Sequence, residues 1–352
     1  MSPRERVVTA MRREKPDRVP KSAGFTPAIQ EKFEQATGQT NAAEYFGYET
    51  RGLGFRGSED EPTDWSPYYP DGCPDGTTFN EYGGGRNPAG FYHFTGRLYP
   101  LENVDSVQEL EEYPWPDYTP VCRHEHLEES CRELHDAGWA VSGSVGHIWE
   151  MAWQMTRMEK LMEDMVFHPE FAAHIFDRIT EDRAFMARRV AEAGADIIHC
   201  GDDVGMQDRL MMSPEMWRQW LKPRWRKVIK AAKDANPDCL VFYHSDGDIR
   251  EVIEDLIEIG FDILNPVQPE CMDPAALKRE YGDRLAFWGC IGTQTTMPFG
   301  TADEVRADVK WTIENVGQGG GLFIAPTHVL EPEVPWENVE ALFEAVAEYG
   351  KY

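Results

Sequence analysis

The sequence predicts an α/β protein with a single (β/α)8 barrel spanning residues 1–352. From about residue 139 onward, short apolar runs alternate with amphipathic helical stretches, which is typical of a parallel sheet joined by crossover helices. The apolar runs are continuous, as strands buried on both faces require. A doubly wound nucleotide-binding sheet is the alternative. Because no GxGxxG or GxxxxGK motif opens a helix, a closed barrel is the better interpretation.

Six strand-and-helix units account for the chain from residue 139 on. The predicted strands are 139–145, 195–200, 239–243, 261–265, 285–288 and 321–325. The predicted helices begin near 149 and then cover 169–192, 213–235, 249–259, 274–281, 302–316 and 336–349. Ser213 and Pro214 form a typical helix start, and Gly260 a typical helix end. Earlier units are expected to start at Arg18 and near Arg51.

Residues 57–100 interrupt this alternation with a stretch rich in Gly, Pro, Asp and Tyr. Pro-Asp-Gly turn signals at 70–72 and 74–76 predict an inserted excursion of hairpin and loops. Two interpretations stay open. The excursion is either surface padding or a lid over the open end of the barrel, because long loops are often functional.

The composition excludes several classes of protein. The chain of 352 residues is 41% apolar, enough for a large core, and its net charge of −27 repels nucleic-acid phosphates and anionic lipid. The dense basic run at 222–230 fits a solvated helix face. No apolar stretch is long enough to span a bilayer, and seven scattered cysteines form no CxxC pair. We therefore expect a cytoplasmic protein that binds neither nucleic acid nor membrane; its oligomeric state stays open, a homodimer included.

Histidines and polar residues follow these strands at equivalent places, where barrel enzymes build their active sites. The candidates for catalysis are Asp202, Asp203, His244, Asp246 and His328. The candidates for substrate contact are His147, Trp149, His199, Tyr243, Asn265, Gln268, Trp288 and Cys290. A small-molecule substrate is the expected ligand.

Three of these positions allow two interpretations each. Asp202 and Asp203 point opposite ways on an extended backbone, so one is expected to face the cavity while the other caps a loop through backbone amides. His244 and Asp246 share a face and, with His328 across the barrel, form a competent zinc site; the alternative is ordinary hydrogen bonding. Cys290 is either a nucleophile or a small buried apolar residue.

The chain resembles the uroporphyrinogen decarboxylase superfamily over nearly its whole length. The resemblance is carried by Ala-Pro-Thr-His-Val-Leu-Glu-Pro-Glu-Val-Pro-Trp-Glu-Asn-Val at 325–339 and Pro-Leu-Glu-Asn-Val at 100–104. Further matches are Tyr-Pro-Trp-Pro-Asp at 113–117, Gly-Asp-Asp-Val-Gly at 201–205 and Asn-Pro-Val-Gln-Pro at 265–269. The resemblance implies a barrel enzyme but does not choose one reaction.

Two departures from the family pattern narrow the function. The decarboxylases carry an Arg-Gln-Ala-Gly-Arg type of segment that binds substrate carboxylates, whereas residues 21–27 read Lys-Ser-Ala-Gly-Phe-Thr-Pro; uroporphyrinogen is therefore disfavoured as the substrate. The sister branch of corrinoid-dependent methyltransferases holds zinc through His-x-Cys and a later Cys. The matching positions here are His244, Asp246 and His328, which are harder ligands.

The resemblance thus predicts methyl transfer between a small O- or N-methylated compound and a corrinoid supplied by a partner protein, with a divalent metal such as zinc as cofactor. Two alternatives remain. One is a decarboxylase or other lyase of a smaller carboxylic acid, and the other is a non-catalytic barrel that binds a corrinoid or porphyrinoid.

Overall fold

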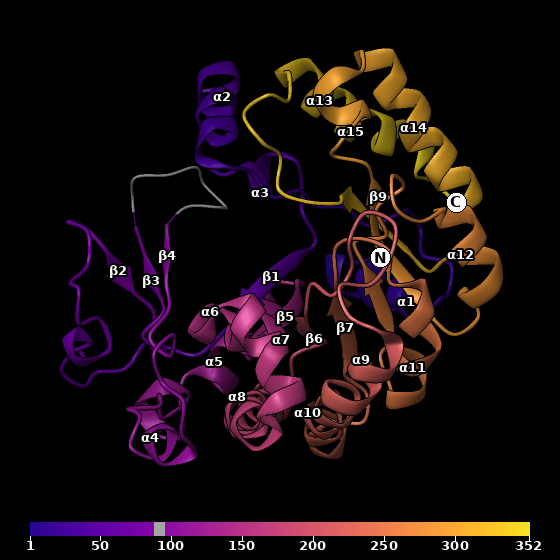
Figure 1. Cartoon of the computed structure of the whole chain (residues 1–352). Helices are drawn as coiled ribbons and strands as arrows, with labels where there is room; N and C mark the ends of the chain where they lie inside the picture. The colour runs from indigo at the N-terminus through magenta and orange to yellow at the C-terminus, as the bar shows by residue number, and fades with distance from the viewer. Residues whose placement is uncertain (88–95) are drawn as a thin grey trace.

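Seven parallel strands form a curled sheet with helices packed around it (Figure 1). The structure is a computed structural model that describes residues 1–87 and 96–352. Every neighbouring pair in the strand order β1-β5-β6-β7-β8-β9-β10 is parallel. The strands are β1 (Thr50–Leu53), β5 (Ala140–Gly146), β6 (Ile197–Gly201), β7 (Leu240–His244), β8 (Ile263–Asn265), β9 (Ala286–Ile291) and β10 (Leu322–Pro326). The predicted α/β class and parallel sheet are confirmed.

The helices follow the strands in the expected alternation. They are α1 (Pro3–Met11), α2 (Pro27–Thr37), α3 (Ala42–Tyr45), α4 (Val107–Glu111), α5 (Leu127–Asp136), α6 (Trp149–Thr156), α7 (Met158–Phe167), α8 (Pro169–Glu192), α9 (Pro214–Trp220), α10 (Lys222–Ala235), α11 (Ile253–Ile259), α12 (Pro274–Tyr281), α13 (Thr296–Phe299), α14 (Ala302–Asn315) and α15 (Trp336–Tyr349). Single 3₁₀ turns lie at Ser66–Tyr68, Val121–Arg123 and Arg250–Val252. The single helix predicted over 213–235 is two helices that meet at Leu221, because Pro223 offers no amide hydrogen to continue α9.

The unit expected at Arg18 contributes a short bridge to the sheet. Lys21 pairs in parallel with Ile324 of β10, where Ile324 N donates to Pro20 O at 2.9 Å and Ser22 N donates to Ile324 O at 3.3 Å. No backbone ladder joins this segment to β1 within the described ranges. The unit expected near Arg51 is β1, which pairs with β5.

Two apolar cores lie on the two faces of the curled sheet. The inner core joins alternate strand residues such as Leu240, Phe242 and Phe323 to Val7 and Met11 of α1. The outer core packs the remaining strand residues against the surrounding helices. Because α1 fills the N-terminal end of the curl, the polar residues are left at the opposite end, where the strands finish.

A small antiparallel sheet stands apart from the seven-stranded sheet, at the left of Figure 1. It consists of β2 (Thr78–Phe79), β3 (Gly85–Arg86) and β4 (Arg97–Leu98). Tyr82, between β2 and β3, anchors it by donating a hydrogen bond to Asp182 of α8 at 2.7 Å. The expected excursion at 57–100 includes residues 88–95, which lie outside the described residues, and its role as a lid stays a prediction. None of the described helices is both long and apolar enough to cross a membrane.

Candidate active site at the open end of the sheet

A cavity of about 990 Å³ opens where the parallel strands end. Many of the residues expected to act there form part of its wall. The predicted residues that line it are His147, His199, Asp203, His244, Asp246, Asn265, Gln268, Trp288 and His328. These residues come from six different strands or the loops that follow them, so the topology brings together side chains that are far apart in the chain.

Strand alternation decides which residues reach the cavity. Along β7, Leu240 and Phe242 belong to the inner core, whereas Val241 and Tyr243 belong to the outer one. Successive side chains of a strand point to opposite faces. His244 therefore points inward and lines the cavity, and His199 of β6 does so for the same reason.

Asp203, His244 and Asp246 form the densest polar group in the cavity. One ligand atom from each lies within 4.8 Å of the others. Asn265 Nδ2 donates to the carbonyl of Trp288 at 2.8 Å, so its Oδ1 is the atom that faces His244 Nδ1. His244 Nδ1 therefore carries a hydrogen, and Nε2 is left facing Asp203 Oδ1 at 3.4 Å.

Two glycines allow the loops that carry these residues to touch. A Cβ added to Gly205 would lie 2.5 Å from the carbonyl oxygen of Asp246, and one added to Gly247 would lie 2.5 Å from the carbonyl carbon of Gly205. Asp246 N also donates to Asp203 Oδ1 at 2.8 Å. The backbone contact between the loops after β6 and β7 thus holds the two carboxylates together.

The donor set of this group fits a divalent cation. Two carboxylates and one imidazole nitrogen are ligands that zinc and other divalent metals accept. Burial raises the pKa of Asp246 to about 6, and its buried Oδ1 has no hydrogen-bond partner among the described residues. A cation would satisfy that oxygen and balance the adjacent negative charges.

His328 lies elsewhere on the cavity wall, outside the compact group. The metal set of His244, Asp246 and His328 stays a prediction; among the described residues, Asp203 rather than His328 lies within 4.8 Å of His244 and Asp246. Burial, together with the charge of His244, lowers the pKa of His328. Gln268 also lines the cavity, and its side-chain oxygen accepts a hydrogen bond from Gly247 N at 2.6 Å, so its amide supports the loop after β7.

Asp202 does not line the cavity, and its predicted catalytic role is corrected. Its side chain is fully buried and accepts hydrogen bonds from Ile148 N at 2.9 Å, Glu150 N at 3.1 Å and Trp225 Nε1 at 3.0 Å. Burial raises its pKa to about 7. Asp202 is the member of the acidic pair that caps a helix start, and Asp203 is the one that faces the cavity.

Two cavity histidines have opposite charge preferences. Burial alone would lower the pKa of His147, but the hydrogen bond and charge of Glu150, at 2.9 Å, raise it to about 9. Burial lowers the pKa of His199 to about 3, and the neighbouring His244 and His147 add to this effect. At neutral pH His147 is thus a cation paired with Glu150, while His199 is a neutral hydrogen-bonding group.

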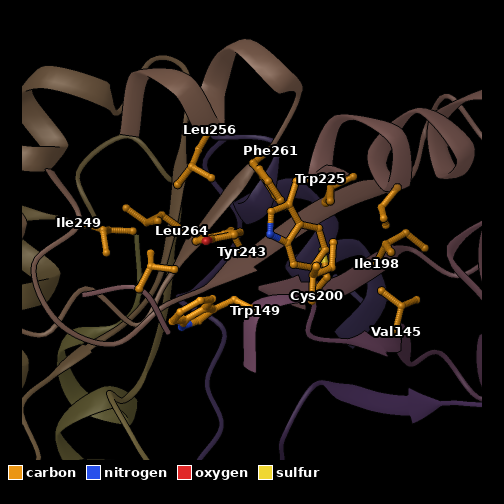
Figure 2. Packing of buried hydrophobic residues seen from close by; sticks show 14 of the residues in the cluster. Val145, Trp149, Ile198, Cys200, Trp225, Tyr243, Ile249, Leu256, Phe261 and Leu264 are labelled. Carbon is orange, nitrogen blue, oxygen red and sulfur yellow. The ribbon is translucent and has the colours of Figure 1, made fainter. Parts of the chain in front are cut away.

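Trp149, Tyr243 and Cys290 lie in the core, and the expectation that they contact a substrate is corrected. Figure 2 shows the rings of Trp149 and Tyr243 among the buried side chains that include Trp225 and Phe261. Tyr243 packs edge-on against Phe261 with 4.7 Å between ring centroids. Burial raises the pKa of Cys290 to about 12, so its thiol is not a nucleophile at neutral pH.

Several cavity residues were not expected from the sequence. Glu150 lies in the first turn of α6, three residues after His147, and this spacing lets the two side chains pair at 2.9 Å. Arg51 of β1 and Arg97 of β4 also line the cavity. Arg51 lies where the sequence predicts an early strand, so its position in that strand could have indicated a place in the cavity wall. Arg97 reaches the cavity from the small sheet, which no local pattern indicates.

Comparisons with known proteins agree with this arrangement. Residues 99–349, more than half of the chain, match the family described as uroporphyrinogen decarboxylase (URO-D). The methylcobamide:CoM methyltransferase MtaA of Methanosarcina barkeri is 29% identical over 199 residues, which are 56% of this chain and 55% of that protein. The uroporphyrinogen decarboxylase of Synechocystis sp. is 26% identical over 210 residues, 58% of this chain and 57% of that one.

A solved structure reproduces the fold. A methyltransferase from Methanosarcina mazei superposes with a TM-score of 0.65 at 20% identity and covers 99% of both chains. The curated relatives are matched over little more than half their length, so their activities are not transferred by similarity alone. The match across residues 99–349 nevertheless settles the ancestry: the chain belongs to the uroporphyrinogen decarboxylase (URO-D) family.

Proposed function

We propose that the chain is a corrinoid-dependent methyltransferase that moves the methyl group of a small O- or N-methyl compound to a corrinoid held by a partner protein. The observation that carries the proposal is the convergence of Asp203, His244 and Asp246 on one cavity. Similarity to a methylcobamide:CoM methyltransferase supports the choice of reaction. In this proposal residues 1–352 form one domain, the bridge at Lys21 completes a (β/α)8 barrel, and the seven free cysteines fit a reducing cytoplasm.

The reaction breaks the bond between the methyl carbon and its oxygen or nitrogen. Cobalt of the reduced corrinoid supplies both electrons of the new carbon–cobalt bond, and the leaving heteroatom keeps the electron pair of the old bond and gains a proton. Asp203, His244 and Asp246 would hold a divalent metal such as zinc at the place where this charge develops. When bound, such a metal acts as a Lewis acid toward the leaving heteroatom.

The remaining residues prepare the site. Asn265 holds the ring of His244 so that Nε2 faces the cavity, as the hydrogen bond at Nδ1 requires. The contact of Gly205 with Gly247 fixes the spacing of the two carboxylates. Phe242 and Trp288 of the inner core give part of the cavity wall an apolar surface.

The test follows the cobalt spectrum when the protein is mixed with a reduced corrinoid protein and a panel of O- and N-methyl donors. The expected result is methyl-cobalt formation with at least one donor and a loss on the order of a hundredfold or more in the His244→Ala variant. His174→Ala, on α8 and away from the cavity, is the matched control and keeps the wild-type rate. Carbon dioxide release without corrinoid would favour the decarboxylase alternative, and corrinoid binding without turnover the non-catalytic one.

A further inference from the structure

Arg97 is a cavity cation whose positive charge is not paired with a carboxylate among the described residues. It lies on β4 and lines the main cavity, and its guanidinium sits over the ring of Trp153 at 5.0 Å. Among the described residues, no carboxylate lies within ion-pair distance and no acceptor receives a hydrogen bond from its side chain. Because partial burial of an unpaired cation is costly, such a group is commonly held for an anionic ligand.

The surroundings of Arg97 do not supply the missing charge. Glu150 is the acidic side chain that influences it, and Glu150 is already paired with His147 at 2.9 Å. Burial, followed by the charge of Arg86, lowers the pKa of Arg97. An anion beside the guanidinium would oppose both effects.

Arg51 of β1 is a second arginine that lines the cavity. Its Nη1 donates to the carbonyls of Tyr48 and Thr50, and its guanidinium lies over the ring of Trp139 at 3.8 Å. The guanidinium of Arg51 is therefore engaged by these carbonyls and by Trp139, whereas that of Arg97 has no carbonyl or carboxylate partner among the described residues. Both guanidinium groups come from the first hundred residues, whereas the compact acidic and imidazole group comes from the loops after β6 and β7.

We propose that the methyl donor is a carboxylic acid whose carboxylate binds the guanidinium of Arg97, while its methyl-bearing oxygen or nitrogen faces His244 and the two carboxylates. This inference rests on the proposed function and names its substrate class. The planar fork of Arg matches a carboxylate with two parallel hydrogen bonds. With one face of the guanidinium on Trp153, the N–H edges remain for the ligand. Arg97 thereby determines specificity and orients the donor.

The experiment compares matched carboxylate and amide probes by isothermal titration calorimetry without corrinoid. The pairs are methoxyacetate with methoxyacetamide and 3-methoxybenzoate with 3-methoxybenzamide. The full-length protein is expected to bind at least one carboxylate about tenfold or more tightly than its amide. Arg97→Gln is expected to weaken carboxylate binding by roughly ten- to a hundredfold and to leave amide binding unchanged, since a hydrogen-bonded charge pair is lost. Arg97→Lys keeps the charge and recovers part of the affinity.

Arg86→Gln is the matched control. Arg86 faces Arg97 across β3 and β4 and is exposed. It lines a second hollow of about 390 Å³, which Arg97 also borders, but unlike Arg97 it does not line the main cavity. Its variant is expected to bind the carboxylates as the wild type does. An equal loss in Arg86→Gln would place the anion in that hollow and overturn the proposal, as would carboxylates that bind no more tightly than amides, or not at all.

Failure of this inference can be told apart from failure of the proposed function. A carboxylate preference that depends on Arg97, found together with no methyl-cobalt formation, supports the anion site and rejects the methyl transfer. Methyl transfer at equal rates from neutral and carboxylate donors would support the proposed function and reject the anion site at Arg97.

Discussion

The adjacent acids Asp202 and Asp203 have different roles, because their side chains point to opposite faces of the sheet at the end of β6. Asp202 is buried and satisfies three donors, from Ile148, Glu150 and Trp225. Asp203 faces the cavity and contacts the backbone of Asp246. A change at the first position should therefore affect folding, whereas a change at the second should affect ligand binding.

We predict that Asp202→Ala lowers the free energy of unfolding by roughly 3 kcal/mol, because it leaves several buried donors without an acceptor. Asp203→Ala should change that free energy by less than about 1 kcal/mol but abolish binding of one equivalent of divalent metal. Urea denaturation measures the first effect, and elemental analysis of protein dialysed against zinc measures the second. Loss of metal from a folded Asp202→Ala protein together with retention by Asp203→Ala would reverse the assignment.

The positions of helices and strands were predictable where the spacing of apolar residues is regular. Helix α8 from Pro169 and strand β6 were both located from the pattern of apolar residues. The period of two along β7 also implied that Tyr243 lies opposite His244, so its burial follows from alternation alone. The approach of β4 to the cavity depends on tertiary contacts such as Tyr82 with Asp182, which sequence spacing does not encode.

The contact between β5 and α8 depends on a missing side chain. A Cβ at Gly143 would lie 2.0 Å from Cγ1 of Val190, which is fully buried. We predict that Gly143→Ala lowers the free energy of unfolding by about 1–3 kcal/mol through overpacking. Adding Val190→Ala should recover much of this loss, because it vacates the contested volume.

Gly52→Ala on the neighbouring β1 is the control for that prediction, since no atom lies within 4 Å of its added Cβ. It should stay within about 0.5 kcal/mol of the wild type in the same denaturation experiment. Strictly additive losses in the Gly143→Ala, Val190→Ala double variant would contradict a direct contact between the two positions.

Closure of the whole molecule depends on a buried carboxylate where the two ends of the curled sheet approach each other. Glu49, 1% exposed, precedes β1 and accepts a hydrogen bond from Lys21 N at 2.9 Å. It also pairs with Arg18 at 2.5 Å and with Arg6 of α1 at 3.3 Å. The Glu49 side chain thus joins the start of β1, the segment bridged to β10, and helix α1 at the N-terminal end of the curled sheet. No local sequence pattern indicates this role of Glu49, because its partners lie up to 43 residues away from it in the chain.

We predict that Glu49→Ala lowers the free energy of unfolding on the order of 3–5 kcal/mol, since it removes the acceptor of the Lys21 amide and one carboxylate partner of both the buried Arg6 and the partly exposed Arg18. Glu254→Ala removes an exposed partner of Arg284 and should cost less than about 1 kcal/mol. Glu49→Gln keeps an acceptor for the Lys21 amide, so its loss of unfolding free energy should lie between those of Glu49→Ala and Glu254→Ala. Equal denaturation midpoints for Glu49→Ala and Glu254→Ala would mean that backbone contacts at Ile324, and not this carboxylate, hold the ends of the sheet together.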